Sequence, residues 1–198
     1  MIKMDTGSRF PIESFVMVTQ ELSFYETLCD YNKQDCIPTE KILRESMGTG
    51  SGVIVGSKNG QSLVLTAGHV CSAQRTGIPI TQDIGLQYIM SLESGFGKEA
   101  YGTILAIDIS NDLCLMIADN DLGPVLTIAD KGPLLHEKIY NMSSPFGLAL
   151  PLAVPIFDGY FVGQVDTIYT FSLPAAPGSS GSPILNKDGE IISIISGA

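Results

Sequence analysis

The sequence predicts an all-β protein, either a barrel or a sandwich. Hydrophobic residues make up 44% of the 198 residues and charged residues only 16%, a balance that excludes a disordered chain. The 21 glycines and 11 prolines supply frequent turns. From Gly48 onward, short apolar runs recur without a sustained helical period, each bounded by Gly, Asn, Asp, Ser or Pro. This punctuation is typical of short antiparallel strands.

The expected strands follow one another along the chain. Residues 1–45 combine a β-like run, SFVMVT, with a charged and more helical run that begins at TEKIL. The later runs are SGVIVGS, QSLVLTA, GLQYIMS, AYGTILAID, LCLMIA, PVLTIA, EKIYNMS, YFVGQVD, TIYTFS, SPIL and EIISIIS. A break at 119–123, DNDLG, is a candidate linker between two halves. We therefore expect an N-terminal extension at 1–45, a first β unit at 46–122 and a second at 123–198.

The charge balance excludes some partners. Eleven cationic and 21 acidic side chains give a net charge of −10, and so few cations do not make a phosphate-binding surface. Nucleic acid and membranes are therefore not expected as partners. The first residues lack an apolar secretory segment, and no apolar run approaches the ~20 residues of a membrane-spanning helix. These features predict a cytoplasmic protein, and a viral or phage origin is compatible with them.

The four cysteines do not have the spacing of a disulfide scaffold. Without an export signal, reduced thiols are the expectation for Cys71 and Cys114. Cys29 and Cys36 could close a small loop in an oxidising compartment. The chain has no C-x-x-C pair to support a zinc site, so we expect no metal and no cofactor.

Two features could carry chemistry. His69 directly follows the apolar run LVLTA, where a buried strand ends, whereas His136 is flanked by charge and is expected in solvent. The segment PGSSGSPIL at 177–185 places glycines around Ser180, and glycine allows a sharp turn with successive N–H groups on one side. Such donors can hold an oxyanion. Taken alone, each feature has an ordinary interpretation, a satisfied histidine or a plain Gly/Ser turn.

Four motifs in order resemble the trypsin/chymotrypsin-like serine proteases. They are GTGSGVI at 48–54, TAGHV at 66–70, a DLCLMI strand opened by Asp112, and GSSGSP at 178–183. The PGSSGSP sequence looks like the Deg/HtrA branch, and viral members use a similar motif. The resemblance implies two six-stranded antiparallel β-barrels packed together, with residues 1–45 as an extra N-terminal segment.

The resemblance also implies a hydrolase that cleaves peptide bonds through a triad. His69 would take the proton of Ser180, and Asp112 would orient His69. The backbone N–H groups of Gly178 and Ser180 would form the oxyanion hole. The competing aspartates, Asp108 and Asp119, do not open a comparable strand.

The same resemblance implies two walls for the substrate pocket. One wall holds Ala175 and Ala176, and the other holds Ser196 and Gly197, with Ser196 also matching the family's serine near the triad aspartate. The first wall, 173–177, has no acidic residue. A small or medium apolar side chain of a protein or peptide substrate is therefore expected. Nothing in the sequence indicates the oligomeric state.

Two other interpretations remain open. One is a catalytically silent trypsin-like fold used as a binding or structural module, for example in a viral particle or a larger assembly. The presence of all three triad residues argues against it. The other is an unrelated β-sandwich with accidental motifs, which four ordered matches disfavour.

Overall fold

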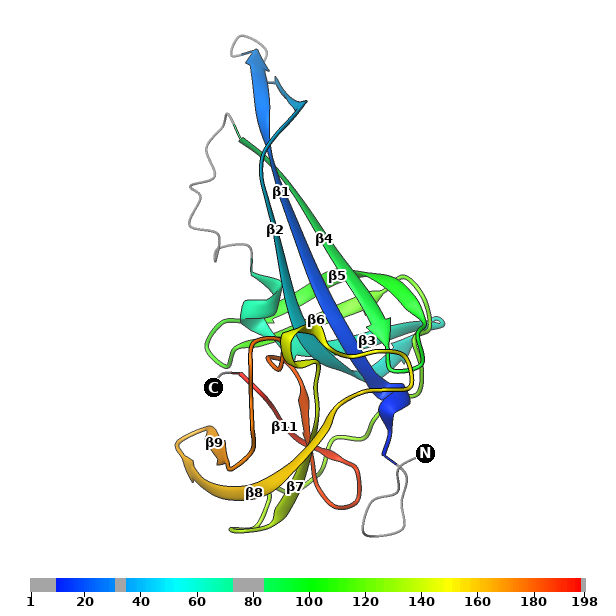
Figure 1. Cartoon of the computed structure of the whole chain (residues 1–198), viewed down its shortest axis with the longest axis vertical. Helices are drawn as coiled ribbons and strands as arrows, with labels where there is room; N and C mark the ends of the chain where they lie inside the picture. The colour runs from blue at the N-terminus through cyan, green and yellow to red at the C-terminus, as the bar shows by residue number, and fades with distance from the viewer. Residues whose placement is uncertain (1–9, 31–34, 73–83, 197–198) are drawn as a thin grey trace.

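Two antiparallel sheets make up the protein (Figure 1). The structure is a computed structural model that describes residues 10–30, 35–72 and 84–196. The strands of the first sheet are β1 (Phe15–Asp30), β2 (Asp35–Lys58), β3 (Gln61–Ala67), β4 (Ile84–Ser94), β5 (Glu99–Asp108) and β6 (Leu113–Ala118). Those of the second are β7 (Lys138–Met142), β8 (Ile156–Val165), β9 (Ile168–Phe171), β10 (Pro183–Leu185) and β11 (Ile191–Ile194). Short 3-10 turns in the described residues are η1 (Ile12–Ser14), η2 (Gly68–Cys71) and η4 (Pro145–Gly147).

The first sheet closes into a barrel in the order β1-β2-β3-β6-β5-β4. Its inward face is set by alternation, because successive strand side chains point to opposite faces. Strands β3 and β6 both alternate partly exposed and buried residues, so that Val64, Cys114 and Met116 point inward and are fully buried. The apolar runs of the sequence therefore form one continuous barrel core.

The second sheet has the order β11-β10-β7-β8-β9 and curls as a half-barrel. The predicted all-β fold with two packed units is confirmed, although this sheet has five strands in the described residues where six were expected. A buried cluster joins it to the barrel and includes Phe15, Val53, Met142 and Leu185. The segment after the DNDLG break crosses between the halves, since the Leu126 N–H donates to the Ile54 carbonyl at 2.8 Å.

No helix in the described stretches is long and apolar enough to cross a bilayer.

Strand β1 lies within the segment expected to be an N-terminal extension. It pairs with β2 from Phe15↔Val53 onward and with β4 from Val16↔Ser94. The first barrel therefore begins well before residue 46. The reason is the apolar run at 14–19, which supplies the buried Val16 and Val18 of the barrel core.

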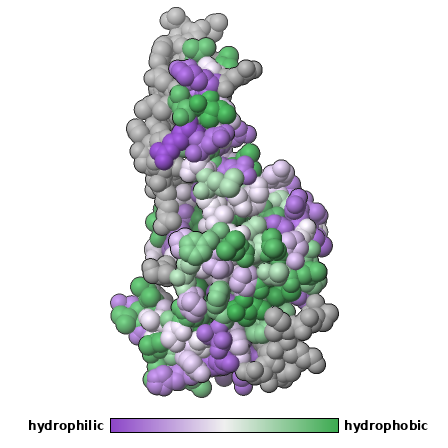
Figure 2. Space-filling model, viewed as in Figure 1, coloured by the Kyte–Doolittle hydropathy of each residue, from purple (hydrophilic) through white to green (hydrophobic). Residues whose placement is uncertain are grey.

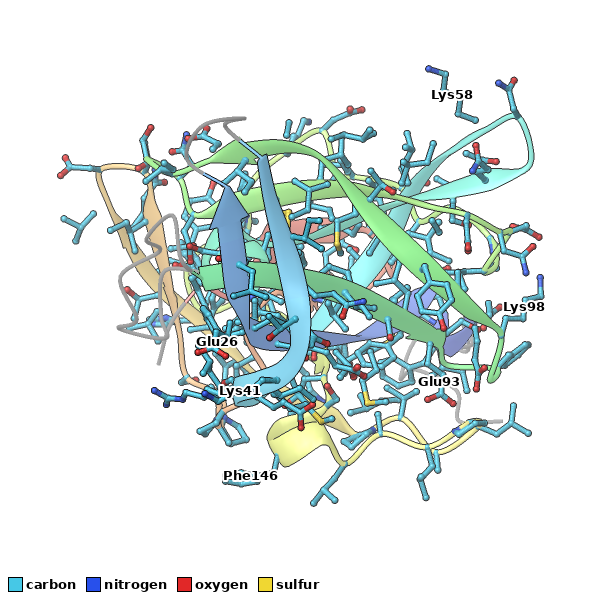
Figure 3. The ribbon with its side chains drawn as sticks, turned by 90° about the horizontal axis from the view of Figure 1, so that it is seen from above. Glu26, Lys41, Lys58, Glu93, Lys98 and Phe146 are labelled. Carbon is cyan, nitrogen blue, oxygen red and sulfur yellow. A yellow bond between two sulfur atoms is a disulfide. The ribbon has the colours of Figure 1, made fainter. Side chains whose placement is uncertain are left out.

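The far ends of β1, β2 and β4 extend beyond the barrel as a projecting arm (Figure 1). On the face that Figure 2 shows, hydrophilic and hydrophobic patches alternate along this arm. Leu28, Ile37 and Met47 are exposed there. Glu26 and Lys41 form an ion pair across it at 3.3 Å (Figure 3).

We expect Met116→Ala to destabilise the protein by about 2–5 kcal/mol, because it removes a fully buried side chain from the barrel core and leaves a cavity. Urea unfolding of both proteins measures the change. The matched control is Met47→Ala, at a side chain 71% exposed on β2, which should change the unfolding free energy by less than about 0.5 kcal/mol. Equal effects of the two substitutions would contradict the assigned barrel interior.

Candidate active site

His69 and Asp112 meet at the end of two paired strands. His69 lies in η2, directly after β3, and Asp112 lies in the turn before β6. The register pairs Ala67 with Leu113, which brings the two residues side by side. The His69 Nδ1 is 2.8 Å from Asp112 Oδ2, and the His69 backbone N–H donates to Asp112 Oδ1 at 2.8 Å. Because an ionised carboxylate only accepts hydrogen bonds, Nδ1 carries the proton and Nε2 is free to act as a base.

The His69–Asp112 pair is held by the close approach of the two backbone segments that carry it. The Gly68 N–H donates to the Asp112 carbonyl at 2.8 Å. A Cβ at Gly68 would lie 3.1 Å from three atoms of Asp112 and Leu113, so a larger residue would push the strands apart. Asp112 itself has a φ of 51°, in the left-handed region that aspartate tolerates better than most residues. The glycine in TAGHV therefore has a steric role.

The surroundings of Asp112 favour its charged form. Burial alone would raise the pKa of its carboxyl, but hydrogen bonds from the side chain and backbone of His69, attraction to His69 and a hydrogen bond from Ser196 together lower that pKa below its ordinary value of 3.8. Ser196 thus contacts the aspartate. The expected triad aspartate stays ionised beside the imidazole.

The two competing aspartates have local structural roles. Asp108 accepts hydrogen bonds from the backbone N–H groups of Ser110 and Asn111 at 3.0 and 3.1 Å, within the turn that leads to Asp112. Hydrogen bonds from the Asn111 side chain and backbone, and from Ser110, lower the pKa of Asp108. Asp119 accepts the Tyr101 N–H at 2.9 Å.

A disulfide joins Cys71 to Cys114, directly beside the His69–Asp112 pair. The expectation of reduced thiols at these two positions was wrong. The cause is the pairing of β3 with β6: Thr66 lies opposite Cys114, and η2 carries Cys71 back over the same strand end. Each cysteine follows a residue of the pair by two positions, so the disulfide ties together the two segments that carry them. Cys29 lies opposite Cys36 in the β1–β2 register, and their side chains lie outside the described residues.

The turn around Ser180 has the form expected of a nucleophile turn. The Ser179 N–H donates to the Ala176 carbonyl at 2.8 Å, and Gly178 has a φ of +95°. A proline at the second position and a glycine with positive φ at the third are typical of a type II turn. Within the described residues, no hydrogen bond uses the N–H groups of Gly178 or Ser180.

The nucleophile turn packs against the strand that ends at His69. A Cβ at Gly181, whose φ is +86°, would collide with the Ser51 carbonyl and the Thr66 hydroxyl and would lie 2.9 Å from the Ala67 nitrogen. Ser180 is partly exposed. No hydrogen bond joins its hydroxyl to the His69 ring in the described part of the chain, which is common in unliganded enzymes. The structure thus brings the turn that carries Ser180 to the end of β3, which η2 and His69 follow.

The expected pocket residues fall into two groups. Ala175 and Ala176 are partly buried in the segment before the nucleophile, whereas Gly197 lies outside the described residues. Apolar side chains around the second sheet gather into a cluster of Ile139, Ile184 and Ile195 with Phe171, Leu173 and Ile192. A hollow of about 520 Å³ elsewhere, on the outside of the barrel, contains none of the triad residues; it is lined by Met17, Thr19, Ser91, Leu92, Glu93, Glu99, Ala100, Tyr101, Asp119 and Asn120.

Sequence reasoning missed two buried serines behind the nucleophile turn, Ser51 and Ser144. Both are fully buried. The hydroxyl of Ser51 donates to the Gly178 carbonyl at 2.8 Å. The available signal was a small polar residue inside an otherwise apolar strand, SGVIV. His136 is exposed, as predicted.

This combination of fold and site defines a trypsin-like peptidase domain. The family described as "Trypsin-like peptidase domain" matches residues 50–194, and the chain belongs to that family. The crystal structure of the serine endoprotease from Yersinia pestis has the same fold, with a TM-score of 0.61, 18% identity, and coverage of 93% of this chain and 54% of that one.

Curated relatives belong to the Deg/HtrA type. The chain is 27% identical over 163 residues to "Serine protease Do-like HtrA" of Bacillus subtilis, covering 74% of this chain and 33% of that protein. It is 30% identical over 165 residues to "Serine protease HTRA3" of Rattus norvegicus, covering 75% of this chain and 32% of that protein. It is also 27% identical over 155 residues to "Probable periplasmic serine endoprotease DegP-like" of Halomonas elongata, covering 76% and 29%. The chain therefore spans about a third of the length of these relatives.

We expect the contribution of Asp112 to stability to disappear in acid. Its pKa in the folded protein is below 3.8, so the unfolded chain binds this proton more tightly. The stabilisation is complete above that value and is lost as the pH falls through the folded pKa. Urea unfolding of wild type and Asp112→Asn between about pH 5 and pH 2 measures it. The gap between the two unfolding free energies should shrink on acidification, and a gap that widens would contradict the assigned hydrogen bonds.

Proposed function

We propose that this chain is a serine endopeptidase with Ser180 as nucleophile, His69 as general base and Asp112 as the group that orients His69. The observation that carries the proposal is the pair of 2.8 Å hydrogen bonds from His69 to Asp112, beside a glycine-flanked serine turn in a member of the trypsin-like peptidase family. The relatives are named serine proteases, which supports the same reaction.

The reaction follows from the roles of the three side chains. His69 Nε2 takes the hydroxyl proton of Ser180 as the oxygen attacks the substrate carbonyl, and the imidazolium then gives the proton to the leaving amine. Water then attacks the acyl-enzyme, and His69 takes a proton from this water. The imidazolium returns the proton to the Ser180 oxygen as the acid product leaves. The ionised Asp112 stabilises the imidazolium while it exists and keeps Nε2 directed outward.

The N–H groups of Gly178 and Ser180 supply the proposed oxyanion hole. Both are free of hydrogen bonds within the described residues. Such donors stabilise the negative charge that develops on the substrate oxygen, each contributing about 2.7–4 kcal/mol to the transition state.

A small or medium apolar residue is the proposed substrate side chain before the scissile bond. Ala175 and Ala176, which form the first proposed wall, have small apolar side chains and are partly buried. No acidic residue stands at 173–177 to bind a lysine or arginine. The substrate is therefore a protein or peptide with an apolar residue at this position.

The cytoplasmic location stays a prediction, and the disulfide counts against it. Disulfides such as Cys71–Cys114 persist in oxidising compartments and are rare where thiols are kept reduced. The name of the Halomonas elongata relative places that protein in the periplasm. We therefore propose an oxidising compartment as the site of action.

Replacing Ser180 by Ala should abolish reaction with a fluorophosphonate probe and lower kcat by about 10⁶-fold, because the nucleophilic oxygen is removed. Intact-mass spectrometry detects the adduct on wild type. Ser57→Ala, at an exposed serine of β2, is the control and should keep both labelling and activity. A folded wild type that forms no adduct and cleaves no peptide would instead favour the silent binding module.

Peptides that differ only at the residue before the scissile bond test the pocket. We expect kcat/KM for Ala or Val at that position to exceed the value for Lys or Asp by about tenfold or more, since a charged side chain would lose its hydration among apolar walls. Ser180→Ala provides the background rate. A preference for Lys or Arg would overturn the proposed specificity.

A further inference from the structure

The GTGSG motif contains a side chain that the proposed reaction does not use. Ser51 lies on β2, is 0% exposed, and directly precedes the apolar run GVIV of that strand. Ser144, just before η4, is equally buried. A buried hydroxyl costs free energy unless its hydrogen bonds are satisfied. The partners of these two hydroxyls therefore indicate why serine occupies the positions.

Ser51 contacts both ends of the nucleophile turn. Its hydroxyl donates to the Gly178 carbonyl at 2.8 Å, and its backbone N–H donates to the Ser180 carbonyl at 2.8 Å. The same hydroxyl accepts the Ser144 N–H at 2.9 Å, and the two hydroxyl oxygens are 3.1 Å apart. The Ser144 hydroxyl reaches the Gly50 carbonyl at 3.1 Å. One side chain thus joins β2, the residues before η4 and the nucleophile turn.

The remaining carbonyls of the turn are held as well. The Pro177 carbonyl accepts the Phe146 N–H at 2.6 Å, and the Ser179 carbonyl accepts the Ser182 N–H at 3.1 Å. Because a trans peptide is planar, fixing each carbonyl directs the N–H of the next residue to the opposite side. These next residues are Gly178 and Ser180, the two proposed oxyanion donors. The Phe146 side chain points outward from this turn and is exposed (Figure 3).

The peptide between Pro177 and Gly178 is the one that can reverse. Type I and type II turns differ mainly in the orientation of this central peptide, and only the type II form needs a positive φ at its third residue. Gly178 has the type II sign, with a φ of +95°. Reversal of the Pro177–Gly178 peptide would turn the Gly178 N–H away from the proposed oxyanion position. The hydrogen bond from Ser51 to the Gly178 carbonyl acts on the adjoining peptide and so opposes this reversal.

Glycines let β2 come close enough for these contacts. A Cβ at Gly50 would lie 2.8 Å from a methyl group of Val70 and 3.2 Å from the Ser180 carbonyl. A Cβ at Gly52 would lie 3.0 Å from Val64. The motif therefore combines close approach at the glycines with a hydrogen-bond donor at the serine between them.

We propose that Ser51 is a positioning residue that holds the Gly178 and Ser180 N–H groups in the orientation needed to bind the oxyanion, with Ser144 supporting its hydroxyl. The inference rests on the proposed serine endopeptidase function for its effect on rate. The orientation of the nucleophile turn itself does not depend on that function.

The test compares Ser51→Ala with Ser62→Ala. Ser62 is also 0% exposed on the same barrel, and its hydroxyl accepts the Leu122 N–H at 3.0 Å, with no hydrogen bond to the nucleophile turn among the described residues. Both variants lose one buried hydroxyl, so a loss of stability alone should affect them alike. We expect Ser51→Ala to lower kcat by about 10- to 100-fold with KM unchanged, because displaced donors weaken binding of the transition state only. A kcat equal to that of Ser62→Ala would overturn the inference.

The amide ¹H–¹⁵N spectrum supplies a readout that does not need activity. Ser51→Ala should shift the Gly178 and Ser180 amide resonances, and Ser62→Ala should leave them unchanged. If Ser51→Ala does not fold, Ser144→Ala takes its place, with a smaller shift expected because the Ser51–Gly178 hydrogen bond is kept. A wild type without hydrolytic activity would contradict the proposed function, while unchanged Gly178 and Ser180 resonances in the serine variants would contradict this inference.

Discussion

A backbone hydrogen bond of 2.8 Å from Ser51 to the Ser180 carbonyl sets the distance between the two halves of the site. His69 and Asp112 belong to the closed barrel, whereas Ser180 precedes β10 of the other sheet. A site divided in this way depends on how closely the sheets approach. Glycine at positions 50 and 181 permits the approach, because any side chain there would collide with the facing backbone or with Val70. Next to Ser180 the seam between the sheets therefore consists of small residues and hydrogen bonds, whereas the cluster with Phe15, Val53, Met142 and Leu185 joins the sheets elsewhere.

The barrel half of the site is held by a compact set of contacts around the ends of β3 and β6. Backbone pairing places Ala67 opposite Leu113, so that η2, which follows β3, carries His69 next to Asp112 in the turn before β6. The Cys71–Cys114 disulfide closes the same junction covalently. Three kinds of interaction thus restrict the relative motion of the imidazole and the carboxylate. Such restriction favours catalysis, since a small displacement of a reacting group lowers the rate considerably.

Ion pairs contribute little to holding the fold. In the part of the chain that the structure describes, the pairs between lysine and acidic side chains, such as Lys98–Asp121 and Lys138–Asp158, are largely exposed. Exposed pairs of this kind contribute about 0–1 kcal/mol each. The partly buried His69–Asp112 pair belongs to the candidate site. The net charge of −10 is therefore a property of the surface, and the apolar clusters and the seam carry the stability.

The recurring apolar runs and glycine-flanked turns were sufficient to predict the all-β class, because they are local properties. The pairing of His69 with Asp112 was predicted only through the resemblance of the ordered motifs to trypsin-like proteases. The barrel position of β1, the Cys71–Cys114 disulfide and the contacts of Ser51 and Ser144 were decided by the tertiary structure. Each of these depends on which strand ends lie next to one another across the sheet or the seam. Spacing along the chain does not specify that, since residues 43 or 127 positions apart become neighbours only when the strands pair and the two sheets pack.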